Sequence, residues 1–155
     1  MKIRLFVIFF IFMMVCAFAA AKVETVNKTK ILKQEGWQEE YNKYRPDDGL
    51  IEALKPSIGD NLRIDVYLAF WCSDSRRNVP AFVKIIEKLG AAGLKVNYFT
   101  VERKSSRDVK FFPGVEALKV ERVPTFIFYR GGKEIGRIIE NPKASLVEDF
   151  LEITF

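Results

Sequence analysis

The chain has 155 residues, of which 49% are hydrophobic and 14% aromatic. This is enough to bury one compact core, and the chain is too short for two full domains. The net charge of +5 at pH 7 is small and no basic run is interleaved with aromatic residues, so we expect no nucleic-acid partner. The absence of histidine excludes histidine-based triads and leaves no credible zinc or iron cluster, so we expect no metal and no cofactor.

Residues 1–21 have the order of a secretory signal peptide. Lys2 and Arg4 precede an apolar run over 5–18, and small residues close the segment at Ala19 to Ala21. We therefore expect this segment to be cleaved and the rest of the chain to be exported, to the periplasm or outside the cell. The alternative is a retained membrane anchor, because the run is only slightly short for a bilayer span. Membrane contact is expected only through this segment, if it stays uncleaved.

Export decides what the two cysteines can do. Cys16 lies inside the expected signal peptide, so the mature chain keeps Cys72 alone and forms no internal disulfide. Cleavage also removes Lys2 and Arg4 from the 25 basic residues, which leaves 23 against 20 acidic residues and a net charge of +3. A lone exported thiol is either buried and inert or exposed and used.

Residues 22–61 are polar and loosely patterned, and we expect an N-terminal extension of one or two helices packed on the main domain. Aromatic residues recur in this stretch about once per helical turn, until Pro46 breaks the pattern. Asp47 or Asp48 is suited to cap a short helix that runs through Leu54.

Residues 62–155 carry the pattern of a single domain. The segment 62–70 is a nearly continuous apolar run, typical of a strand covered on both faces. It leads into a helical stripe of apolar side chains that ends at Gly90, and a second strand follows over 94–101. Strand, helix and strand in this order indicate a parallel pair with a right-handed crossover. Cys72 therefore lies where a buried strand turns into a helix.

The last third of the chain predicts a hairpin and a closing helix. A charged loop over 102–108 and a short apolar element over 115–120 come first. Two β-rich runs then flank Gly131 and Gly132, which tolerate the positive φ of a hairpin turn. An amphipathic helix over 145–153 ends the chain. The order of elements predicts an α/β fold with a mixed central sheet and helices on both faces.

Three separate motifs in the segment 62–155 resemble the thioredoxin family. They are Phe70-Trp71-Cys72-x-x-Ser75 at the strand-to-helix junction, Val123-Pro124-Thr125 before the hairpin, and Phe128-Tyr129-Arg130-Gly131-Gly132-Lys133 at its turn. The resemblance implies a thioredoxin fold. More narrowly, the sequence over 71–80 looks like exported bacterial thioredoxin-like proteins in which serine replaces the second active-site cysteine.

Two departures from the dithiol pattern of this family remove parts of its usual resolving step. Ser75 stands where dithiol members have the resolving cysteine. Val66 occupies the strand position, six residues before the nucleophile, where they carry a buried carboxylate. Asp65 is one residue off and, by strand alternation, should face the other way.

The resemblance also implies a role for each residue of the site. Cys72 is the nucleophile, with Ser75 as the second catalytic position. Trp71 shields the sulfur and covers the substrate, and a cis bond before Pro124 leaves the backbone of Val123 free to pair with an extended substrate. The plainer alternatives are core packing for Trp71 and an ordinary trans proline for Pro124.

The start of the helix after Cys72 is expected to favour the reactive thiolate. Unpaired N–H groups and the positive end of the helix dipole stabilise the anion. The Ser75 hydroxyl is placed to donate to the sulfur and Arg76 and Arg77 add positive charge, whereas Asp74 opposes the effect. We expect the helix end and the hydroxyl to outweigh Asp74.

Two functions fit these residues. In the first, Cys72 attacks a disulfide of a protein substrate, and a second substrate thiol or a small thiol releases the mixed disulfide because Ser75 cannot. This favours isomerisation, deglutathionylation or mixed-disulfide capture over net oxidation or reduction. In the second, the chain is a redox-inactive module that binds a protein segment in a groove beside Pro124. We favour the first, because Trp71 and Cys72 at a helix start form a reactive environment that a bare scaffold does not require.

Overall fold

The computed structural model of the chain describes residues 23–59, 61–104 and 110–155. The expected signal peptide, with Cys16, lies outside the described residues. Within these three ranges, no helix combines the length and the apolar character that a bilayer span requires.

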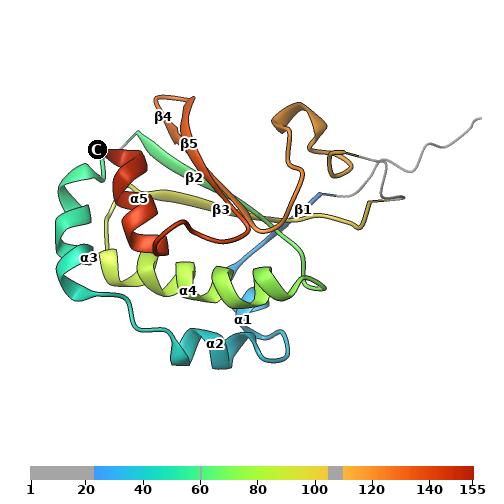
Figure 1. Ribbon diagram of the computed structural model, residues 1–155, viewed down its shortest axis with the longest axis horizontal. Coiled ribbons are helices and arrows are strands. Elements are labelled where there is room, and N and C mark those ends of the chain that lie inside the picture. Colours follow the sequence, from blue (N-terminus) through green and yellow to red (C-terminus); the bar gives the residue numbers. More distant parts are fainter. Residues whose placement is uncertain (1–22, 60, 105–109) are drawn as a thin grey trace, which may run out of the picture.

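A mixed sheet stands at the centre of the described part of the chain (Figure 1). Its five strands are β1 (Glu24–Val26), β2 (Leu62–Leu68), β3 (Lys95–Thr100), β4 (Thr125–Arg130) and β5 (Lys133–Ile139). They lie in the order β1-β3-β2-β4-β5; β2 and β3 are parallel, and every other neighbouring pair is antiparallel. The predicted α/β thioredoxin fold, with a mixed central sheet, is confirmed.

Five α-helices accompany the sheet in these residues. They are α1 (Lys28–Leu32), α2 (Trp37–Lys43), α3 (Asp48–Leu54), α4 (Ser73–Leu89) and α5 (Leu146–Thr154), with the short 3₁₀ helices η1 (Lys55–Ser57) and η2 (Glu116–Leu118). Asp47, one of the two predicted caps, accepts a hydrogen bond from the backbone N–H of Leu50 and so begins α3. Helix α4 ends at Gly90, whose φ of 56° is left-handed. Local sequence signals therefore set these two helix ends.

The N-terminal segment differs from the expected extension of one or two helices. Besides three α-helices it contributes β1, which pairs antiparallel with β3 at the edge of the sheet. Trp37 and Leu54 are fully buried in the same core as Phe82 of α4. The segment is thus built into the sheet and the core, while a domain boundary at residue 61 stays a prediction.

The two faces of the sheet are covered unequally. The larger core, on one face, includes buried residues from all five described α-helices. The smaller core includes Tyr67 and Ile127 of the sheet and is covered by the segment around η2, through Phe112 and Val120. Helices on both faces were expected; the α-helices pack into the larger core, and in the described residues the second face has only η2.

Candidate functional site

Cys72 lies at the N-cap of α4, directly after the central strand β2. Its backbone N–H donates to the carbonyl of Ala69 at 3.1 Å, and its own carbonyl accepts from the N–H of Arg76 at 3.0 Å, which closes the first turn of the helix. The side chain is half-buried and forms no disulfide. The strand-to-helix pattern of the sequence therefore places the sulfur at a helix N-terminus.

The loop before β4 lies directly against this sulfur. The Val123–Pro124 peptide bond is cis. The Cys72 Sγ donates a hydrogen bond to the carbonyl oxygen of Val123 at 3.1 Å. Two further bonds fix the loop: Thr125 Oγ1 donates to the carbonyl of Arg122 at 2.7 Å, and the N–H of Glu140 donates to the carbonyl of Pro124 at 2.7 Å. The fold thus brings together two predicted site residues that are 51 positions apart.

A groove of about 510 Å³ opens beside the sulfur. Its apolar lining comes from Trp71, Phe112 and Val123. The Trp71 side chain is 42% exposed, so it is not a residue of the packed core, and its ring centroid lies 6.2 Å from that of Phe112. An exposed tryptophan beside an accessible cysteine offers a wall on which a substrate chain can lie.

Ser75 has a different partner from the one expected. The residue is fully buried, and its Oγ accepts a hydrogen bond from the backbone N–H of Ala69 at 3.2 Å. In the described part of the chain no hydrogen bond joins Ser75 to the sulfur of Cys72. The hydroxyl is directed back to the end of β2, so Ser75 holds the strand-to-helix junction together.

The three charged residues expected to influence the thiol, Asp74, Arg76 and Arg77, differ in their surroundings. The carboxylate of Asp74 pairs with Arg77 at 2.6 Å, which offsets part of its charge. The exposed Arg76 borders a small hollow of about 130 Å³ together with Cys72. An influence of Asp74 and Arg76 on the reactivity of the sulfur stays a prediction.

Strand alternation along β2 agrees with the predicted orientation of its two central residues. Val66 is fully buried in the larger core, so no carboxylate lies at that position. Asp65 is also buried, and the side-chain amide of Asn97 donates to its Oδ1 at 2.8 Å while Arg63 pairs with it at 3.2 Å. Its charge is therefore held by partners other than the thiol.

The groove also contains charged residues that no sequence motif marks. Arg103 and Lys104 line it, together with Glu121, Arg122 and Glu140. Arg103 and Lys104 could have been predicted from the order of the strands. They follow β3, which is parallel to β2, and the carboxyl ends of parallel strands meet at one edge of a sheet. The loop after β3 thus shares its edge with Cys72.

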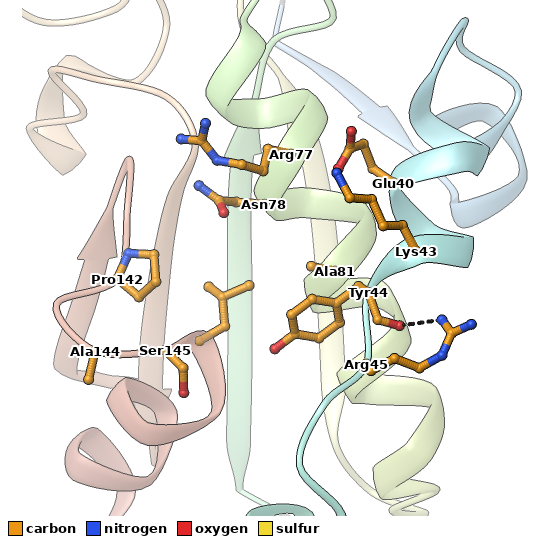
Figure 2. Close-up of a pocket in the computed structure, with 11 residues that line it drawn as sticks. Glu40, Lys43, Tyr44, Arg45, Arg77, Asn78, Ala81, Pro142, Ala144 and Ser145 are labelled. Carbon is orange, nitrogen blue, oxygen red and sulfur yellow. Dashed lines mark hydrogen bonds between the residues drawn. The ribbon is translucent and has the colours of Figure 1, made fainter.

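A second hollow, of about 450 Å³, lies beside α4 (Figure 2). Tyr44 lines it from the end of α2, Arg77 and Asn78 from α4, and Pro142 from the loop before α5. The Asn78 amide donates to the carbonyl of Glu140 at 2.7 Å, so this side of α4 is tied to the loop after β5. Burial raises the pKa of Tyr44. The hollow has no cysteine in its lining.

These features define a class of protein. A free cysteine begins the helix after the central strand of a mixed sheet and faces a proline loop, which is the arrangement of thioredoxin-fold proteins. The model of the family described as Thioredoxin matches residues 20–149. The chain belongs to the thioredoxin family, and this membership supports a thiol–disulfide redox function in general.

No group of three or more side chains suited to hold a metal occurs in the described ranges.

The chain is similar to proteins from several sources. It is 30% identical over 87 residues to thioredoxin-2 of Saccharomyces cerevisiae, covering 56% of this chain and 75% of that protein. It is 24% identical over 99 residues to a thioredoxin-like protein of Acanthamoeba polyphaga mimivirus, covering 62% and 67%. A solved protein of unknown function from Pseudomonas aeruginosa matches with a TM-score of 0.58 at 18% identity, covering 83% of this chain and 85% of that chain. This last likeness concerns the fold alone.

Proposed function

We propose that the protein performs monothiol thiol–disulfide exchange through Cys72. The observation that carries the proposal is the position of its sulfur, which lies at the N-terminus of α4, half-exposed beside a groove. In the reaction the Cys72 thiolate attacks one sulfur of a substrate disulfide. A bond forms between these two sulfurs, and the other substrate sulfur leaves as a thiolate.

Release of the mixed disulfide requires a thiol from outside the chain. Cys72 is the one cysteine of the described residues, and the hydroxyl of Ser75 is buried against Ala69. A second thiol of the substrate, or a small external thiol, attacks the mixed disulfide and frees Cys72 as a thiolate. This supports isomerisation, deglutathionylation or capture of a substrate as a mixed disulfide.

The substrates we propose are protein disulfides and thiols. An extended substrate segment would pair with the backbone of Val123, next to Pro124, and lie under the exposed ring of Trp71. We further propose that the protein is an exported bacterial Cys-x-x-Ser variant that works in the periplasm or outside the cell. The order of residues 1–21 supports export, and disulfides persist in such oxidising compartments.

One observation favours a second candidate, the redox-inactive binding module. The Cys72 sulfur donates a hydrogen bond to the Val123 carbonyl, and a sulfur that donates carries its proton. Disulfide exchange needs the thiolate. In this second function the groove beside Pro124 holds a protein segment without forming a covalent bond.

A trapping experiment separates the two functions. The wild-type chain and the variant Cys72→Ala are each expressed, and their partners in the exported fraction are recovered after free thiols are blocked. Monothiol exchange predicts covalent partners that a reductant releases from the wild type and that the variant lacks. Recovery of the same non-covalent partners by both proteins would establish the binding module and contradict the exchange reaction.

A further inference from the structure

The carboxylates that line the Cys72 groove already have cationic partners. Glu121 pairs with Lys110 at 3.3 Å, and Glu140 pairs with Arg122 at 2.6 Å. The charges of Glu121 and Glu140 are therefore partly offset within the protein itself. A cationic group of a substrate would therefore gain little binding energy from either carboxylate.

Two cations that line the same groove, Arg103 and Lys104, contact aromatic rings instead of carboxylates. The Arg103 guanidinium lies 4.2 Å from the centroid of the Trp71 ring, and the Lys104 ammonium lies 4.8 Å from that of Phe112. Lys104 also donates to the carbonyl of Lys110 at 2.6 Å. Neither cation forms a salt bridge within the described ranges. An aromatic ring or a carbonyl positions a cation without cancelling its net charge.

These two charges lie where the residues next to a bound cysteine would pass. Trp71 precedes Cys72 in the chain, and its ring carries the Arg103 guanidinium. The groove that begins at the sulfur is bordered by both Arg103 and Lys104. Any peptide bound through its sulfur to Cys72 and lying along Trp71 therefore passes close to two positive charges that no salt bridge of the described residues offsets.

From this asymmetry we infer that the groove selects acidic peptide segments, with aspartate or glutamate next to the cysteine that Cys72 attacks. The inference rests on the proposed function and adds a substrate class to it. The carboxylates bind Arg103 and Lys104 while the substrate sulfur meets Cys72, and guanidinium binds carboxylate in a two-pronged geometry. Lysine or arginine at the same substrate positions is repelled, which adds to the selectivity.

The test uses three synthetic peptides that differ only in the residues beside one cysteine: glutamate, glutamine or lysine. Each is supplied as a mixed disulfide with an aromatic thiol. When Cys72 attacks the peptide sulfur, the peptide becomes bound to Cys72 and the coloured aromatic thiolate leaves, so its absorbance gives the rate. We expect the wild type to react about fivefold faster with the glutamate peptide than with the lysine peptide at low salt. The difference should shrink at high salt.

Two double variants assign the preference to the groove. Arg103→Gln with Lys104→Gln should reduce the ratio of the glutamate rate to the lysine rate to nearly one. Lys95→Gln with Lys133→Gln removes the same charge from two exposed residues at the other end of the sheet, where β2 begins and the β4–β5 hairpin turns. This control should retain the ratio of the wild type.

The outcomes distinguish the substrate class from the reaction itself. Equal rates of the wild type with the glutamate and lysine peptides would overturn the inference and leave the exchange reaction standing. Survival of the ratio in the Arg103 and Lys104 variant would overturn it as well. If none of the three peptides forms an adduct with the wild type, the exchange reaction is wrong and the inference is wrong with it.

Discussion

The two faces of the central sheet differ in their packing and in their exposure. On the larger core the rings of Phe82, Phe126 and Phe150 are fully buried, and Phe82 lies 4.8 Å from Phe126 between centroids. On the other face the packed residues are mixed with polar ones, such as the buried Asp65, and the edge ends in the exposed Trp71. The comparison teaches that the first face stabilises the fold, while the edge of the second provides the site.

The strongest test of this division compares one aromatic residue from each region. Phe82→Ala removes a fully buried ring and should lower the free energy of unfolding by about 3–5 kcal/mol. Trp71→Ala removes a ring that is 42% exposed, and its contact with Arg103 accounts for only about 0.5–1 kcal/mol. Urea unfolding curves measure both variants. Equal losses of stability in the two would contradict the division.

A second test concerns the junction that connects the two regions. Ser75→Ala leaves the buried N–H of Ala69 without its acceptor and should lower the free energy of unfolding by about 1–3 kcal/mol. The control is Ser73→Ala, two residues earlier, where the side chain is exposed and the change should stay within about 0.5 kcal/mol. The same urea measurement applies. If Ser75→Ala is as stable as this control, Ser75 does not hold the junction.

A third expected effect appears only at alkaline pH. Burial, and then the nearby Asp65 carboxylate, raises the pKa of Tyr67 from 10.0 to about 12. Because folding raises this pKa, the folded protein favours the neutral form of Tyr67. The stability that this preference contributes is fully present below pH 10 and is lost as the pH rises through about 12. Tyr67→Phe should therefore make the fall in unfolding free energy between these values shallower, by about 1.4 kcal/mol per pH unit. Superimposable profiles of stability against pH would show that folding does not raise the pKa of Tyr67.

Much of the fold was predictable because its signals are local. The apolar run of β2, the end of α4 at Gly90 and the Asp47 cap are each encoded within a few neighbouring residues. Strand β1 was missed because three residues are too short to show a periodic pattern. Its partner β3 lies more than 70 positions further along the chain, from Glu24 to Thr100. Long-range pairing of this kind leaves no trace in a local window.

The site was predictable to a similar extent. Cys72, Trp71 and Val123 are marked by motifs, and the structure brings them to one groove. The Ala69 partner of Ser75 could not be predicted, because a buried hydroxyl takes whichever backbone group the fold places next to it. The position of Arg103 in the groove also follows only from the strand order, because the parallel pairing of β3 with β2 brings its loop to the edge where Cys72 lies.

The most direct test of the account is the intact mass of residues 22–155, in which Cys72 is the one cysteine, after incubation with a peptide disulfide. Attack by Cys72 predicts one peptide added to the wild type, removed again by a reductant, and no addition to Cys72→Ala. A wild-type mass that stays unchanged while the protein remains folded would contradict the exchange reaction at its first step.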